Sequence, residues 1–159
     1  MSQDINIEIP KKDKSCDQIK SIKIINFRSY ENFGLEFSGK PVGIIGDNGI
    51  GKTNILEAIS LFSPGRGMRN ASFSEMIKDN NSKPWGISAE VLSDKKKYKI
   101  SSGIKEQLRG RDIKVNEKKI SGSSVLPKII LISWLTPSMD RIFNETPSYR
   151  RKFIDRLCA

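Results

Sequence analysis

The stretch Gly46-Asp47-Asn48-Gly49-Ile50-Gly51-Lys52-Thr53 matches the pattern G-x-x-x-x-G-K-[ST], and it decides how the rest of the chain is interpreted. A chain of phosphates needs consecutive backbone N–H donors turned inward, and bulky side chains at those positions would block its approach. Glycine at three of the eight positions permits this approach and the positive φ angles that accompany it. The pattern therefore predicts a phosphate-binding loop; the alternative is a glycine-rich turn without a ligand.

Each residue of the loop has an expected part in binding a nucleotide. Lys52 is expected to reach the β- and γ-phosphates as a mobile charge, and the Thr53 hydroxyl to bind Mg²⁺. A helix that begins at Lys52 would add the positive end of its dipole. The candidate nucleotide-binding residues are Gly46, Asp47, Asn48, Gly49, Ile50, Gly51, Lys52 and Thr53.

The flanks of the loop supply the context that the motif requires, a strand before it and a helix after it. Residues Val42–Ile45 are apolar on both faces, which predicts a buried central strand. A helix follows and ends at Ser63-Pro64-Gly65. Its predicted apolar face consists of Ile55, Leu56, Ile59 and Phe62, at positions i, i+1, i+4 and i+7.

The rest of the chain shows mostly the alternation of β-strands. Strands are predicted over 19–27 and 33–38, with Ile22, Ile24 and Asn26 on one face and Lys23, Ile25 and Phe27 on the other. An antiparallel meander is predicted over 87–91, 98–100, 113–115 and around 120, after an irregular loop with a short helix at Ser74–Lys78. A short buried strand is expected at Ile129–Ile132, and helices at Pro137 and Pro147 with Thr136 and Thr146 as N-caps.

The charge of the chain is +10 and is concentrated in its second half. Residues 83–120 carry eleven Lys and Arg against five Asp and Glu. Such an excess indicates a polyanionic partner such as DNA or RNA, although a Lys-rich solubilising surface is the alternative. The candidate contacts are Lys95, Lys96 and Lys97 at a predicted hairpin tip, and Arg150, Arg151 and Lys152 at the start of the last helix. A charged turn and ordinary helix packing are the alternatives.

Composition excludes several classes of site and location. The chain has no histidine and only two cysteines, Cys16 and Cys158, which excludes histidine triads and closed zinc sites. It has no run of apolar residues long enough to cross a membrane and no secretory signal at its start. A cytoplasmic protein is therefore expected.

Two further stretches identify the kind of nucleotide-binding protein. The guanine-specificity sequence Asn-Lys-x-Asp is absent, and Asn54 after the loop favours the head of an ATP-binding cassette protein. The sequence Ile24–Tyr30 (IINFRSY) resembles the first strand of SMC-like ATPases. The stretches GDNGIGKTNILEAISLFSPGRGMR (46–69) and WLTPSMDRIFNETPSYRRKFIDRL (134–157) resemble the RecF family of bacterial recombination mediators, so that the resemblance covers about residues 19–159.

The resemblance implies an α/β P-loop fold of the ABC/SMC head type, in which an antiparallel meander belongs to the nucleotide-binding lobe and the C-terminal helices begin a second lobe. It implies that Arg28 reaches the nucleotide, that the cofactors are ATP and Mg²⁺, and that ATP drives homodimerisation. It also implies binding to single-stranded or gapped DNA, and work with recombination mediator proteins to load recombinase in DNA repair, replication and the SOS response to DNA damage. Arg66 and Arg69 are expected to meet DNA or the partner subunit, or else to lie in a solvated loop.

The chain lacks two motifs that such ATPases use. The only candidate for the acidic Walker B strand, Ile129–Ile132, ends in Ser133-Trp134, and Ser121–Ser124 is the nearest approach to a signature loop. We therefore expect a disordered tail at 1–17 and a truncated, N-terminal part of an ATPase domain at 18–159, with little or no ATPase activity alone. The alternatives are a non-functional truncated remnant and another SMC-like ATPase head.

Overall fold

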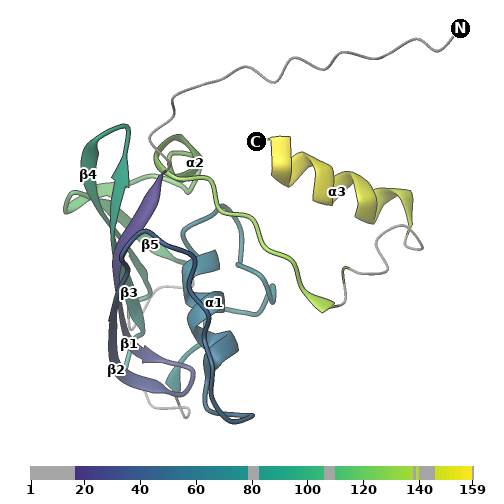
Figure 1. Ribbon diagram of the computed structural model, residues 1–159. Helices are drawn as coiled ribbons and strands as arrows, with labels where there is room; N and C mark the ends of the chain where they lie inside the picture. Colours follow the sequence, from purple (N-terminus) through teal and green to yellow (C-terminus); the bar gives the residue numbers. More distant parts are fainter. Residues whose placement is uncertain (1–16, 79–82, 106–109, 138, 140–145, 159) are drawn as a thin grey trace, which may run out of the picture.

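The computed structural model describes residues 17–78, 83–105, 110–137, 139 and 146–158. Its main feature is a six-stranded antiparallel sheet with the strand order β2-β1-β3-β4-β5-β6. Helix α1 covers one face of this sheet, and helix α3 stands farther out on the same side (Figure 1). The predicted antiparallel meander is confirmed, and the expected tail lies outside the described residues except for Asp17.

The elements have the following bounds. The strands are β1 (Gln18–Phe27), β2 (Tyr30–Glu36), β3 (Gly86–Ser93), β4 (Lys96–Gly103), β5 (Asp112–Val115) and β6 (Lys118–Ile120). The helices are α1 (Lys52–Ser60), α2 (Leu126–Ile129) and α3 (Pro147–Cys158). The loop motif and α1 are therefore inserted between β2 and β3, which are separated in the sheet by β1.

The core lies between the sheet and α1. Alternate residues of each strand are buried there, because successive side chains of a strand point to opposite faces. Helix α1 and the turn after it contribute Ile55, Ala58, Leu61 and Phe62, all at most 4% exposed. Leu56, predicted on this apolar face, is instead 48% exposed, and the neighbouring Glu57 is completely buried. The apolar side of α1 is therefore narrower than the sequence pattern indicated, and it contains a charge.

At the C-terminal end of β1, the side chains no longer alternate strictly between the two faces of the sheet. Phe27, predicted to share a face with Lys23 and Ile25, is fully buried on the core side. The reason is Asn26, whose φ of 49° lies in the left-handed region and rotates the chain by one face. The Phe27 ring then packs edge-on against Trp85 at 5.4 Å. This rotation carries the following residue, Arg28, toward α1.

Two predicted strands are absent from the described residues. Val42–Ile45 forms no strand, and Val42 and Ile45 are 53% and 96% exposed. Ile129–Ile132 is also wrong as a strand, because Ile129 ends α2 and Leu131 is 51% exposed. Neither segment lies beside a hydrogen-bonding strand in this part of the molecule, and an apolar run becomes a strand only when its backbone is paired.

Of the three remaining predicted helices, only the one at Pro147 is an α-helix in the structure. Thr146 precedes Pro147 at the beginning of α3, and its carbonyl accepts a hydrogen bond from the Arg150 N–H at 3.2 Å, which confirms that prediction. At Pro137 the structure has a short 3₁₀ helix rather than an α-helix, to which Pro137 and Met139 belong, and the Met139 N–H donates to the Thr136 carbonyl at 2.8 Å. The helix expected at Ser74–Lys78 is a turn that ends in an isolated bridge between Phe27 and Ile77.

Arg111, in the connection before β5, fixes the end of α1 to the sheet. Its Nη1 donates to the Leu61 carbonyl at 2.6 Å and its Nη2 to the Ser63 carbonyl at 3.1 Å. The guanidinium lies 5.8 Å from the centre of the Phe73 ring. Burial lowers the pKa of Arg111 to about 10, so the group stays charged at neutral pH. A positive charge at the C-terminal end of a helix is stabilising.

We predict that Arg111→Met destabilises the fold. Two charge-assisted hydrogen bonds are lost and two carbonyls lose their donor, so the free energy of unfolding should fall by about 1.5–3 kcal/mol. Urea denaturation measures this change. The control is Lys118→Gln, an exposed change on β6 that should stay within about 0.5 kcal/mol of wild type. Equal losses in the two variants would contradict the role of Arg111.

Candidate nucleotide-binding site

The loop before α1 depends on two glycines. Gly49 and Gly51 have φ angles of 87° and 109°, a region that side-chain-bearing residues rarely adopt. A Cβ at position 51 would also lie 2.6 Å from Ser29 Oγ and 2.9 Å from Tyr30 Oη. Glycine at 51 is thus required both by its own backbone and by the turn between β1 and β2. The loop is held against that turn.

Helix α1 presents its N-terminal end to the loop. Gly51 is its N-cap, and no side chain caps the helix there. The first turn contains no acidic residue. Since the first N–H groups of a helix have no partner within it and carry partial positive charge, this end favours an anion. This is the arrangement that a phosphate group requires.

The Lys52 ammonium lies over the loop itself. It donates to the Gly46 carbonyl at 2.6 Å and to the Asp47 carbonyl at 2.7 Å. Both acceptors are neutral, so phosphate oxygens would be stronger partners for the ammonium. Thr53 is exposed in the first turn of α1, next to Lys52. In the described ranges no group of three or more Asp, Glu or Cys could hold a metal ion. The role of the Thr53 hydroxyl as a Mg²⁺ ligand stays a prediction.

The remaining loop residues are open to solvent. Gly46, Asp47, Asn48 and Ile50 are exposed, and Ile50 is 61% accessible although it is apolar. The structure thus brings the eight predicted residues together in one exposed loop at the start of α1.

A buried carboxylate lies one helical turn beyond Thr53. Glu57 is 0% exposed and accepts three hydrogen bonds from two arginines. Arg28 donates from Nε at 3.0 Å and from Nη2 at 2.7 Å, and Arg69 donates from Nη1 at 2.8 Å. A buried carboxylate is tolerated only with such partners. Glu57 therefore holds both arginines beside the middle of α1.

Glu57 was not predicted as a site residue from the sequence. The available signal was an acidic residue between Ile55 and Ala58, on a helix face that should be apolar. A charge at such a position is usually paired, because an unpaired charge is very costly to bury. Arg28 and Arg69 were recognised as candidates, but their common partner was missed.

Arg28 has all of its guanidinium nitrogens in use. Besides Glu57, it donates from Nη1 to the Glu75 carbonyl at 2.7 Å, and its backbone N–H donates to Met76 at 2.8 Å. The φ of Arg28 is 52°, so this position is in the left-handed region. Its expected contact with a nucleotide stays a prediction, since in this structure the guanidinium points to Glu57.

A second set of bonds connects the same groups to the turn after β1. Arg69 Nη1 donates to Asn54 Oδ1 at 3.0 Å, and Asn54 Nδ2 donates to Ser29 Oγ at 3.0 Å. Ser29 is the residue that Gly51 leaves room for. The loop, α1 and the β1–β2 turn are therefore linked by one continuous polar network. Arg66 is exposed in the loop beyond α1.

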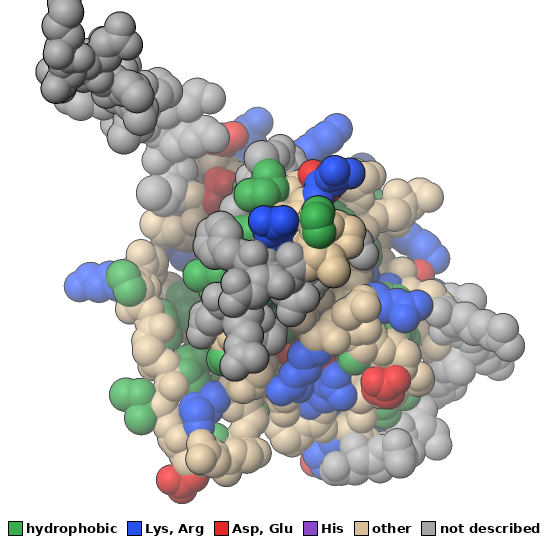
Figure 2. Space-filling model, turned by 90° about the vertical axis from the view of Figure 1, so that its right-hand side faces the viewer, with side chains coloured by type: hydrophobic (Ala, Val, Ile, Leu, Met, Phe, Trp, Pro, Cys, Tyr) green, Lys and Arg blue, Asp and Glu red, His purple; other side chains and the backbone are tan. Residues whose placement is uncertain are grey.

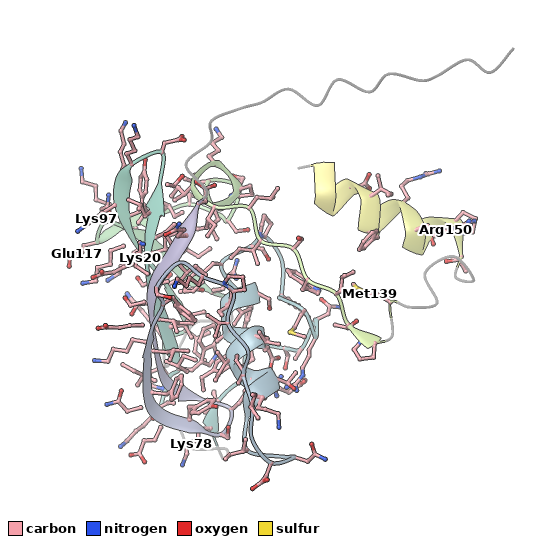
Figure 3. The ribbon with its side chains drawn as sticks, viewed as in Figure 1. Lys20, Lys78, Lys97, Glu117, Met139 and Arg150 are labelled. Carbon is pink, nitrogen blue, oxygen red and sulfur yellow. The ribbon has the colours of Figure 1, made fainter. Side chains whose placement is uncertain are left out.

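The candidate DNA contacts fall in two separate places. Lys95 lies in the turn between β3 and β4 and Lys96 and Lys97 begin β4, all three exposed. Arg150 and Arg151 are exposed in the first half of α3, and Lys152 belongs to the same helix. Lys97 and Arg150 lie on opposite sides of the molecule (Figure 3). The structure does not combine them into one surface.

We predict that Glu57→Gln lowers the free energy of unfolding by up to about 3 kcal/mol. Glutamine keeps the shape but leaves two positive charges together, and solvent partly screens arginines that are 21% and 40% exposed. Urea denaturation measures the loss. Glu75→Gln, at an exposed carboxylate bonded to Ser72, is the matched control and should change little. A Glu57→Gln protein as stable as that control would refute the role given to the network.

Comparisons with known proteins agree with this geometry. The family model described as the RecF/RecN/SMC N terminal domain matches residues 18–128. The DNA replication and repair protein RecF of Rickettsia akari (strain Hartford) is 40% identical over 139 residues. RecF of Rhizobium leguminosarum bv. trifolii (strain WSM2304) is 34% identical over 141 residues. Each alignment covers 87% of this chain and 38% of the relative, so the chain spans less than two-fifths of their length.

Solved structures give the same result. A structure described as the recombination mediator protein RecF-ATP in the RecFOR pathway superposes with a TM-score of 0.70 at 33% identity, covering 87% of this chain and 38% of that one. The SMC head domain from Thermotoga maritima gives 0.59 at 17% identity, covering 81% and 51%, and supports the fold alone. These matches confirm the predicted α/β P-loop head of the ABC/SMC type.

In the described ranges, no helix combines the length and the apolar character that crossing a bilayer requires.

The match to the family model extends over the strands of the sheet, the glycine-rich loop before α1, α1 itself and most of α2. The chain belongs to the RecF/RecN/SMC N-terminal domain family, and its matched relatives are RecF proteins.

Proposed function

We propose that this chain is the nucleotide-binding, N-terminal part of a RecF-type protein of DNA replication and repair. It binds ATP with Mg²⁺ through Gly46–Thr53, and residues 18–159 form the corresponding part of the ATPase domain. In the complete protein, ATP binding promotes pairing of two heads on single-stranded or gapped DNA. With recombination mediator proteins this complex supports recombinase loading in the cytoplasm, including the SOS response to DNA damage.

The observation that carries the proposal is the conformation of the loop. Gly49 and Gly51 have the backbone that close phosphate approach requires, Lys52 lies over the loop, and an uncapped helix end follows. The chain is also similar to a protein whose solved structure is described as RecF-ATP. Hydrolysis is a different matter, because this chain contains no acidic Walker B strand and no signature loop. We expect little or no ATPase activity from it alone.

Two alternatives differ in what they predict. Another SMC-like head is less well supported, since the Thermotoga SMC head is 17% identical and the RecF-ATP protein 33%. A non-functional remnant is favoured by the exposure of Val42, Ile45 and Leu135, which leaves apolar surface in water. A remnant of this kind would not bind ATP in a Lys52-dependent manner.

Removing the loop lysine tests nucleotide binding. Lys52→Ala should weaken Mg·ATP binding by about ten- to a hundred-fold, because a charge-assisted phosphate contact contributes about 1.5–3 kcal/mol. Isothermal titration calorimetry measures both affinities. Lys128→Ala, an exposed lysine of α2, is the control and should bind as wild type. Equal affinity for wild type and Lys52→Ala would rule out the assignment of the loop.

Salt dependence tests DNA binding and the two candidate sites. Wild-type affinity should fall steeply with salt, and each lost phosphate contact should reduce the log–log slope by about 0.7 for single strands and 0.9 for duplex. We expect one triple variant, Lys95→Gln/Lys96→Gln/Lys97→Gln or Arg150→Gln/Arg151→Gln/Lys152→Gln, to reduce the slope and the other to leave it unchanged. Fluorescence anisotropy with labelled oligonucleotides measures both. Unchanged slopes in both variants would place the DNA contact elsewhere.

A further inference from the structure

The face of the sheet opposite to α1 carries no helix among the described residues (Figures 1 and 3). Buried Ile100, Ser102 and Ile113 point to the α1 side, so the residues between them point to the uncovered side. We call this uncovered side the open face. Its lysines are Lys23 of β1, Lys97 and Lys99 of β4, Lys114 of β5 and Lys119 of β6.

These lysines are adjacent to one another across the strands. Lys114 and Lys119 are directly opposite in the register of β5 and β6. Like charges in opposite positions of an antiparallel pair are destabilising, by an amount on the order of 0.2–1 kcal/mol. Folding alone does not favour such a pair. Local arrangements that cost stability are expected at functional or strained sites.

The acidic residues on this side only partly offset the positive charge. Lys119 pairs with Asp112 at 2.8 Å and thereby holds the pKa of that carboxyl below its usual range, while Lys105 lies 3.6 Å from the same group. Lys99 pairs with Glu117 at 3.3 Å, and both are more than half exposed. Within the described part of the chain, Lys23, Lys97 and Lys114 form no ion pair with an acidic side chain.

The surface between the lysines is a shallow groove. A depression of about 310 Å³ lies between Lys23 and Lys114, and its residues include Gly86, Ser88, Ser101 and Gly103. Because these side chains are small, the surface is depressed between the lysines. Serine hydroxyls are common donors to phosphate oxygens. A second depression of about 430 Å³ continues toward β2, where Glu36 and Glu90 make the surface less positive. The positive part of the groove therefore lies over β4 and β5, where Lys105 and Lys114 line it together with Asp112.

The spacing and the chemistry of this part suit a sugar–phosphate backbone. Residues two apart on a strand are separated by about 6.8 Å, and neighbouring strands by about 4.8 Å. Lysines on this grid offer several flexible charges to successive phosphates. Lysine is a point charge without the planar fork that recognises bases, so binding here would be independent of sequence.

We propose that the open face binds the phosphate backbone of DNA through Lys97, Lys99, Lys114 and Lys119, with Lys23 at the rim of the contact. This inference rests on the proposed function, because it names the surface through which the protein binds DNA. DNA and nucleotide then lie on opposite faces of one sheet, because the phosphate-binding loop belongs to the side that α1 covers (Figure 1). Lys97 belongs both to this surface and to the hairpin group Lys95–Lys97, whereas Lys95, Lys96 and α3 are not the main contact.

Three double variants of the 159-residue chain, each lacking two positive charges, test this surface. Lys97→Gln/Lys114→Gln changes the open face without leaving a described acidic partner unpaired. Lys95→Gln/Lys96→Gln changes only the hairpin tip, and Lys40→Gln/Lys128→Gln changes exposed lysines outside the sheet. Anisotropy with single-stranded and duplex oligonucleotides at 50–200 mM salt gives the log–log slope for each. We expect the open-face variant to lose about 1.5 units and the other two variants almost none.

A second measurement separates binding from folding. Lys114→Gln removes one member of the opposed lysine pair, so its melting temperature should equal or exceed that of wild type while its DNA affinity falls. If wild type binds DNA but the three double variants have equal slopes, the open face is not the contact, although the proposed function stands. If wild type fails to bind DNA while Lys52-dependent ATP binding persists, the DNA-binding part of the proposed function fails together with this inference.

Discussion

The bonds from Arg28 and Arg69 to the completely buried carboxylate of Glu57 are the interaction on which the candidate nucleotide site depends. The carboxylate holds Arg28, from the turn after β1, and Arg69, from the loop after α1, against the same helix. A buried acid in this position is tolerated only while it keeps an arginine partner. The sheet, α1 and the loop that follows it therefore adopt their arrangement together, and the phosphate-binding loop at the start of α1 acquires a fixed position.

Because α1 and its loops occupy one face of the sheet, the two faces have different chemistry. The covered face is apolar apart from Glu57 and a few serines, and the first turn of the helix on it presents N–H groups to an anion. The open face has only small and charged side chains over β4 and β5, apart from the edges of the groove. Figure 2 looks onto the side that carries α3, where Lys and Arg side chains are scattered among hydrophobic and uncharged ones. The proposed nucleotide site and the proposed DNA-binding surface thus lie on opposite faces of the sheet and share no charged side chain.

Local patterns predicted the parts of the molecule that depend on neighbours in sequence. The exposed glycine-rich loop before α1, the helix itself and the β3–β4 hairpin all follow from motif spacing or alternation. The strand predicted at Val42–Ile45 failed because pairing is a property of distant segments, and none lies beside it in the described structure. Phe27 was assigned to the wrong face because one left-handed residue, Asn26, reverses the alternation. Glu57 was missed because its partners, Arg28 and Arg69, lie far from it in the sequence and meet it only in the folded chain.

The network around Glu57 also determines what a nucleotide contact by Arg28 would require. Arg28 would have to release three bonds to side-chain and backbone oxygens, which is costly unless the carboxylate keeps another partner. Arg69 is that partner, since it already donates to Glu57 Oε2 at 2.8 Å. A second arginine thus lowers the cost of moving the first. The pairing of one buried acid with two arginines is therefore compatible both with a rigid site and with an Arg28 that turns toward bound phosphates.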